Sequence, residues 1–152
     1  MTINARYAHT NIVAEDWQRL ARFYQQVFGC KPLPPKRQHA GQWLADVTGI
    51  PNAALEGIHL RLPGYNGDNS PTLEIFQYHH AAERPQPAAN RPGFAHIAFA
   101  VVDVEAARQA VLAAGGGELG QPVTVEIAGA GRITLIYMTD PEGNIIELQR
   151  WG

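Results

Sequence analysis

The 152-residue sequence predicts an α+β fold made of two βαβββ modules in a single domain. Two strands that follow turn signals each carry a glutamate between apolar residues, Glu74 in one and Glu147 in the other. Upstream of each lies a short strand with a histidine, His9 or His96, followed by an amphipathic helix. The same order of elements therefore occurs twice: a strand with a histidine, a helix, further strands, and a strand with a glutamate. This internal repeat determines the predicted topology.

A Pro-rich stretch at residues 85–92 separates the two copies of the repeat and predicts a linker. The first module then covers about residues 5–80 and the second about residues 93–151. A chain of this length can bury a substantial core. We therefore expect one domain over residues 1–152, in which the linker permits the modules to pair either within one chain or across a dimer.

In the first module, residues 7–13 predict the opening strand, and an amphipathic helix follows from about Glu15. Gly29 suits the end of that helix, since glycine accepts the left-handed conformation common there. The prolines of residues 32–35 predict an extended connection. Residues 42–50 fit either a strand or a short helix, so this part of the module has two possible secondary structures.

A short strand at residues 58–62 alternates apolar and basic side chains. His59 and Arg61 share one face of this strand, opposite its apolar residues. Two basic side chains on one face of an internal strand either line a pocket or face solvent. We take both, together with Tyr137 of the second module, as candidate substrate-binding residues.

The second module carries clear start and stop signals. Asp103 is a good helix N-cap, and a run of glycines at residues 115–117 follows the apolar helix pattern. Strands are expected at residues 123–127 and 132–138. The sequence Asp-Pro-Glu-Gly at residues 140–143 then predicts a type I turn into the last strand.

Composition and charge exclude several classes of function. Hydrophobic residues make up 45% of the chain and charged residues 17%, as in ordinary soluble globular proteins. A net charge of −2 argues against binding to nucleic acid or acidic membranes. The single cysteine, Cys30, cannot form an internal disulfide, and no apolar run reaches the length of a signal peptide or a membrane span. We therefore expect a soluble cytoplasmic protein.

The candidate chemistry rests on a set of four residues, His9, Glu74, His96 and Glu147. A carboxylate between apolar strand residues either faces solvent at a sheet edge or, if buried, needs a cation, hydrogen-bond donors or a proton. Any one of the histidines alone would fit a core position with satisfied hydrogen bonds. Symmetric modules, however, would bring the four together, and two imidazoles with two carboxylates suit one divalent ion such as Ni²⁺, Zn²⁺, Mn²⁺ or Fe²⁺.

Three segments resemble the vicinal oxygen chelate superfamily: residues 9–29, residues 93–103 and residues 140–147. This superfamily includes glyoxalase I, methylmalonyl-CoA epimerase, extradiol dioxygenases, and fosfomycin and bleomycin resistance proteins, and the resemblance covers essentially the whole chain. It implies two βαβββ modules that form a cupped mixed sheet around one metal ion, with the four residues named above as its ligands. Similarity to bacterial glyoxalase I implies a small-molecule substrate and a homodimer.

Within this superfamily, the His/Glu/His/Glu set resembles glyoxalase I, in which a ligand carboxylate moves a proton between neighbouring carbons. The resemblance implies that Glu147 or Glu74 is the general base. We therefore predict a metal-dependent isomerase or lyase of the glyoxalase I type. If neither carboxylate moves the proton, His59 or Tyr137 is the next candidate.

The alternatives match the sequence less well. Methylmalonyl-CoA epimerase has Gln at the position of Glu74 and an acid/base Glu on the strand of residues 58–62, where this chain has none. Extradiol dioxygenases, which use Fe²⁺, match residues 136–147 but have a His where residues 128–130 are Ala-Gly-Ala. Drug-sequestering resistance proteins lack the metal ligands. A non-catalytic small-molecule-binding module with the same pocket is the alternative from another class.

Overall fold

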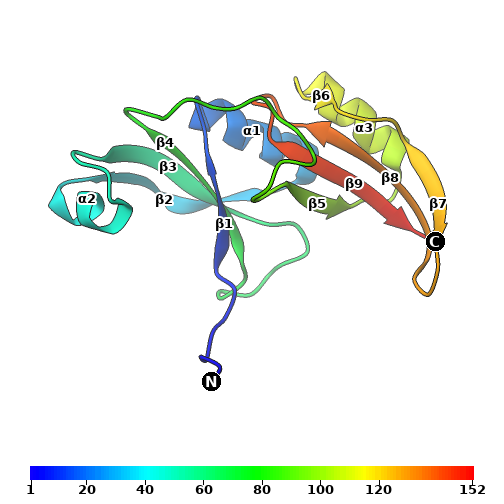
Figure 1. Cartoon of the computed structure of the whole chain (residues 1–152), viewed down its shortest axis with the longest axis horizontal. Helices are drawn as coiled ribbons and strands as arrows, with labels where there is room; N and C mark the ends of the chain where they lie inside the picture. Colours follow the sequence, from blue (N-terminus) through cyan, green and yellow to red (C-terminus); the bar gives the residue numbers. More distant parts are fainter. The chain divides into compact units, whose positions relative to one another are not determined.

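The computed structural model describes residues 1–152 and divides them into two compact units, Met1–Glu83 and Arg84–Gly152. We call these units module 1 and module 2 and describe each by itself (Figure 1). Together they contain three helices and nine strands in two mixed sheets, which confirms the predicted α+β class. None of the helices has the length and apolar character that crossing a membrane requires.

Module 1 follows the predicted βαβββ order, with one additional short helix. Its elements are β1 (His9–Val13), α1 (Trp17–Phe28), β2 (Lys31–Ala40), α2 (Gln42–Thr48), β3 (Ala54–Arg61) and β4 (Thr72–Tyr78). The sheet order is β1-β4-β3-β2, in which β1 runs parallel to β4 and the other neighbours are antiparallel. The first and last strands of the module are therefore hydrogen-bonded neighbours.

Helix α1 begins and ends at signals visible in the sequence. Asp16 accepts a hydrogen bond from the backbone N–H of Arg19 over 3.0 Å, and Gly29 follows the last turn with a φ of 69°. Leu20 and Tyr24 lie one turn apart and are fully buried, because α1 packs on β3 and β4. The helix therefore covers one face of the module 1 sheet.

Two segments of module 1 have a secondary structure that the sequence analysis did not predict or left open. The proline-rich segment expected to be a connection is the edge strand β2, whose register against β3 shifts between Leu33 and Arg37. Two prolines lie within this irregular stretch, where a missing backbone N–H costs no ladder hydrogen bond. The ambiguous residues 42–50 contain helix α2, which ends at Gly49 in the left-handed conformation.

Module 2 repeats the βαβββ order. Its elements are β5 (His96–Ala100), α3 (Val104–Ala113), β6 (Gly117–Glu118), β7 (Val123–Ile127), β8 (Gly131–Thr139) and β9 (Ile145–Trp151). The sheet order is β5-β9-β8-β6, and β7 also pairs with β8. Strands β6 and β7 pair with successive parts of β8, so together they occupy one position in the sheet. As in module 1, the first strand runs parallel to the last.

Helix α3 is capped as predicted, since the Asp103 carboxylate accepts a hydrogen bond from the backbone N–H of Ala106 over 3.0 Å. The helix packs on β8 and β9, and the glycine run follows its last turn. A Cβ atom at Gly116 would lie 2.5 Å from the backbone oxygen of Thr139. Glycine is therefore required there, because the chain passes close to β8 on leaving the helix.

The predicted Asp-Pro-Glu-Gly turn joins β8 to β9. The backbone N–H of Gly143 donates to the Asp140 carbonyl over 3.0 Å. The Asp140 side chain, in a residue only 2% exposed, accepts from the backbone N–H groups of Glu142 (2.9 Å) and Asn144 (3.0 Å) and from Asn144 Nδ2 (2.7 Å). This network fixes the direction in which β9 leaves the turn, and with it the position of Glu147.

Candidate metal centre

In both modules, the register of the two parallel strands puts a histidine and a glutamate on one face of the sheet. Asn11 of β1 lies opposite Glu74 of β4, and Ala98 of β5 lies opposite Glu147 of β9. Each histidine comes two residues before that pairing position, and residues two apart in a strand share a face. We call the face of each sheet that carries the glutamate its site face.

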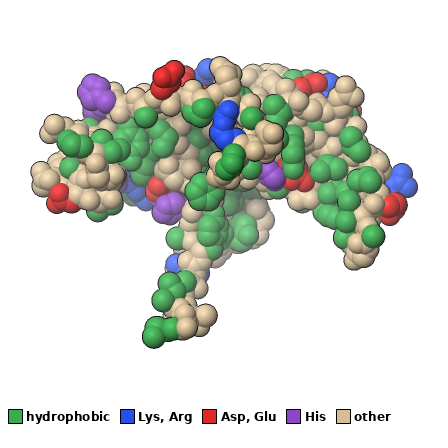
Figure 2. Space-filling view, in the orientation of Figure 1, with side chains coloured by type: hydrophobic (Ala, Val, Ile, Leu, Met, Phe, Trp, Pro, Cys, Tyr) green, Lys and Arg blue, Asp and Glu red, His purple; other side chains and the backbone are tan.

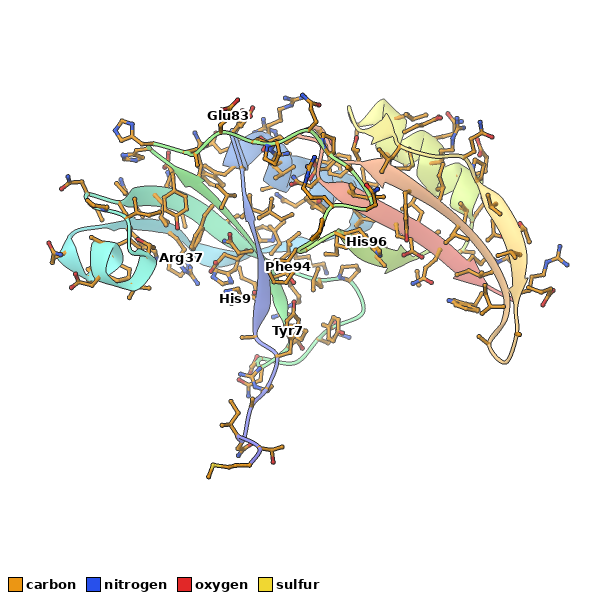
Figure 3. The ribbon with its side chains drawn as sticks, in the orientation of Figure 1. Tyr7, His9, Arg37, Glu83, Phe94 and His96 are labelled. Atoms are coloured by element: carbon orange, nitrogen blue, oxygen red, sulfur yellow. The ribbon has the colours of Figure 1, made fainter.

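The histidine and the glutamate of each module lie close together. His9 Nε2 is 3.5 Å from Glu74 Oε1, and His96 Nε2 is 2.9 Å from Glu147 Oε2. The two carboxylate side chains are only 11% and 13% exposed, so neither faces open solvent at a sheet edge. Figure 3 labels the two histidines, one on each module. The structure thus brings the four predicted ligands together as two pairs, and the sharing of one ion by both pairs stays a prediction.

A third imidazole joins the pair in module 1. His59 lies opposite Glu74 in the antiparallel pairing of β3 with β4, and its Nε2 is 2.6 Å from Glu74 Oε2. The ligating atoms of His9, His59 and Glu74 all lie within 4.8 Å of one another. From the sequence, His59 was assigned to substrate binding. Its place beside Glu74 depends on the register of a long-range strand pairing, which the sequence does not reveal. Module 1 by itself therefore holds a possible metal-binding set of two imidazoles and one carboxylate.

Asn11 is a site residue that the sequence analysis missed. Its side-chain amide donates to Glu74 Oε1 over 2.8 Å, while His59 occupies the other carboxylate oxygen. A signal for it was available, since Asn11 follows His9 by two residues and so shares its strand face. A carboxylate that is held at both oxygens has a fixed orientation.

Module 2 has different neighbours at the corresponding positions. Tyr137 lies opposite Glu147, where module 1 has a histidine, and Ala98 stands where module 1 has an asparagine. The Tyr137 ring packs against His96 with a distance of 4.9 Å between ring centroids. Because alanine has no donor, Glu147 is held by His96 at one oxygen and its other oxygen has no partner.

Burial lowers the pKa of His59 below its usual range. The charges of Arg37 and His9 lower this pKa further, whereas the Glu74 carboxylate opposes the shift. The neutral imidazole is thereby favoured, and it has a lone pair for a metal ion. Thr72 Oγ1 lies 2.8 Å from His59 Nδ1. In the tautomer that donates Nε2–H to Glu74, the Thr72 hydroxyl donates to Nδ1. A metal ion on Nε2 would use the other tautomer, in which Nδ1–H donates to Thr72 Oγ1. The donors of module 1 therefore fit a divalent cation.

The three candidate substrate-binding residues all lie on site faces. Arg61 is half-buried and pairs with Thr72, two residues along β3 from His59. Tyr137 is half-buried on the site face of module 2. Their contact with a substrate stays a prediction.

A family model described as the Glyoxalase/Bleomycin resistance protein/Dioxygenase superfamily matches residues 6–148. Because this match spans nearly the whole chain, the protein belongs to that superfamily. The resemblance drawn from the three sequence segments is thereby confirmed. No curated protein sequence gave a match.

Solved structures share the fold at low sequence identity. A glyoxalase family protein from Bacillus cereus has a TM-score of 0.82 and 20% identity, over 99% of this chain and 96% of that one. A glyoxalase/bleomycin resistance protein/dioxygenase family enzyme from Burkholderia phytofirmans PsJN has a TM-score of 0.61 and 16% identity, over 97% and 100% of the two chains. A glyoxalase I mutant from Zea mays has a TM-score of 0.64 and 22% identity, over 94% of this chain and 45% of the maize chain. These likenesses support the fold.

Proposed function

We propose that this protein is a metal-dependent enzyme of the glyoxalase I type, an isomerase or lyase that moves a proton next to a chelated carbonyl and hydroxyl pair of a small molecule. One observation carries the proposal. The same strand register puts a histidine beside a nearly buried glutamate in each module, at 3.5 Å in one and 2.9 Å in the other. One such pair would fit a structural hydrogen bond, but two in matching positions fit the donor set of a divalent ion.

His9, Glu74, His96 and Glu147 are the proposed ligands, and His59 is a further donor of module 1. The two pairs would share one Ni²⁺, Zn²⁺, Mn²⁺ or Fe²⁺ ion, either within one chain or across a homodimer. When bound, such an ion acts as a Lewis acid toward two neighbouring oxygens of a substrate. Mixed imidazole and carboxylate donors suit these ions better than Ca²⁺, which prefers oxygen alone.

Glu147 is the proposed general base. Both oxygens of Glu74 are occupied, whereas Glu147 is held by His96 at Oε2 only. Its Oε1 is therefore available to take a proton from a substrate carbon. The side chain is 13% exposed, so little water competes for the same position. Tyr137, the cross-strand neighbour of Glu147, supplies a hydroxyl that can orient a substrate oxygen.

Metal analysis of protein purified without chelator tests the proposal. We expect about one divalent ion per set of four ligands, and turnover of thiohemiacetals that chelation removes and added metal restores. His96→Ala should lower the metal content, whereas His79→Ala, at an exposed histidine, should leave it unchanged. Unchanged metal content in His96→Ala would remove His96 from the site. Metal-loaded protein without activity on thiohemiacetals would contradict the glyoxalase I type.

A second candidate function is favoured by the donor set of module 1. His9, His59 and Glu74 form a two-histidine, one-carboxylate set, which is typical of non-haem iron(II) oxygenases. Oxygen uptake with catechols by the Fe²⁺-loaded protein would identify a ring-cleaving dioxygenase. Small-molecule binding without metal and without turnover would instead indicate a binding module.

A further inference from the structure

Three cations lie on the site face of module 1. Alternation along β3 puts Arg61 on the same face as His59, two residues away. The pairing of β2 with β3 places Lys31 opposite Arg61. It also places Arg37 opposite Gly57, the site-face residue on the other side of His59. The two arginines therefore flank the imidazole of the candidate metal centre.

None of these three cations has an acidic partner. The only carboxylate on the site face of β1 to β4 is Glu74, and both of its oxygens are occupied. The opposite face differs, because Lys36 pairs there with Glu56 at an N–O distance of 2.6 Å. The whole chain carries a net charge of −2, so the positive site face is a local feature and not a general excess of basic residues.

Arg37 and Arg61 are both half-buried. Arg37 donates to the backbone carbonyl of Pro35, which uses one of the five N–H donors of a guanidinium. The Arg61 side chain makes no hydrogen bond or ion pair. A cation that has lost part of its hydration and has no counter-charge attracts an anion more strongly than one on the open surface.

The surface around these residues is accessible. The strand pairings put Arg37 and His9 on the same face of the module 1 sheet, and Figure 3 labels both residues. Figure 2 shows basic, acidic and histidine side chains close together on the surface of this module. Helix α2 covers only the far end of the face, where Leu44 belongs to an apolar cluster against Phe76 and Tyr78. The part that carries the cations is left for a ligand.

We propose that the substrate carries an anionic oxygen group, a carboxylate or a phosphoryl group, and that Arg37 and Arg61 bind it. This inference rests on the proposed metal-dependent function. A guanidinium binds such a group through two parallel charge-assisted hydrogen bonds. Residues two apart in a strand are separated by about 7 Å, so the anionic group lies a few bonds from the oxygens that the metal would chelate. A small hydroxy or oxo acid, or its phosphorylated counterpart, has these dimensions.

Calorimetric titration of the metal-free protein with inorganic phosphate and with succinate at low ionic strength tests the anion site alone. We expect the Arg37→Gln/Arg61→Gln double variant to bind the preferred anion about tenfold or more weakly. Arg22→Gln is the matched control, since it removes an exposed arginine from α1 and should bind like the wild type. Arg37→Lys/Arg61→Lys keeps the charge without the planar fork and should be intermediate.

The preferred anion identifies the group, phosphoryl or carboxylate. Wild-type affinity in the double Gln variant, with an unchanged unfolding midpoint, overturns the inference. Failure of the wild type to bind either anion also overturns it.

A second measurement separates this inference from the proposed function. Acetohydroxamic acid and succinic monohydroxamic acid both chelate through two neighbouring oxygens, and only the second carries a carboxylate. In the Ni²⁺-loaded wild type we expect the second to bind about tenfold or more tightly, and the double Gln variant to lose that preference. If the wild type binds both compounds with equal affinity, the inference of an anionic substrate is overturned, whereas the proposed metal site is not affected. If no ion is held and neither compound binds, the proposed function fails, and the metal-free titration still decides the anion site.

Discussion

His59 Nε2 lies 2.6 Å from Glu74 Oε2, so the imidazole and the carboxylate face each other across neighbouring strands β3 and β4. The contact orients a residue that is only 8% exposed. With a metal ion bound, His59 would either donate to the ion itself or hold Glu74 in place. In both cases the removal of His59 weakens metal binding.

We therefore expect His59→Ala to lower metal affinity by about 10–100-fold, the usual effect of removing a group that orients a ligand. His79→Ala is the control, because His79 is an exposed histidine of the same module. Competition titration with a chromophoric chelator measures both affinities. Equal affinities in the two variants would exclude His59 from the metal centre.

The two glutamates are expected to differ in turnover. Glu147→Gln keeps the size and one oxygen donor but removes most of the basicity, and general-base catalysis is typically worth about 10²–10⁴-fold. Glu74→Gln should lower turnover by a smaller or similar factor, because both Glu74 oxygens already have partners. Steady-state kinetics at saturating metal measures both losses. Near-normal turnover in both variants would move the proton transfer to His59 or Tyr137.

The assembly of the two modules is tested by complementation. If each site uses module 1 of one chain and module 2 of another, mixing inactive His9→Ala with inactive His96→Ala protein should restore part of the activity through heterodimers. Pairing within one chain predicts no recovery, since every chain then keeps its own defect. Activity measured before and after joint unfolding and refolding distinguishes the two arrangements, and each variant refolded alone is the control.

Asp140 is expected to stabilise module 2 through its turn. Asp140→Ala leaves two backbone N–H groups and one amide without their acceptor, and unsatisfied buried donors cost about 1–3 kcal/mol each. We expect the free energy of unfolding to fall by at least about 1 kcal/mol in urea titrations. Asp68→Ala, at an exposed loop position, should change it little. Equal unfolding curves for the two variants would contradict the role assigned to the turn.

Cys30 should make stability fall at alkaline pH. The residue is 3% exposed, and burial raises the pKa of its thiol from 9.0 to about 11. The unfolded chain therefore loses the thiol proton before the folded chain does, so the contribution is complete below pH 9 and declines as the pH rises to about 11. Urea titrations across this range should show a smaller decline for Cys30→Ala than for the wild type. Identical pH slopes would contradict the burial of an un-ionised thiol.

Local and repeated signals made most of the fold predictable. The Asp103 cap, the helix end at Gly29 and the Asp-Pro-Glu-Gly turn each act over a few residues, and all three appear in the structure. The order of elements followed from the repeat. The proline-rich segment was taken for a connection because its strand character comes from pairing with β3, a contact that local sequence does not encode.

The candidate site was predictable only in part for the same reason. The histidine and glutamate positions could be read from the repeat, but the cross-strand neighbours of Glu74 depend on the β3–β4 register. His59 was accordingly assigned to the substrate and not to the carboxylate beside it. The burial of Asp140 was also missed, because turn signals do not report how many donors a side chain accepts from.

The two sheets have matching strand registers around their glutamates. The strand positions around Glu74 have counterparts around Glu147, so the site positions of the two modules can be aligned with each other. In that alignment Asn11 stands against Ala98, and His59 stands against Tyr137. The two polar residues of module 1 contact Glu74, whereas module 2 has an alanine and a tyrosine at these positions and Glu147 contacts His96 alone. Under the proposed function, module 1 would hold its carboxylate in place and module 2 would supply the general base.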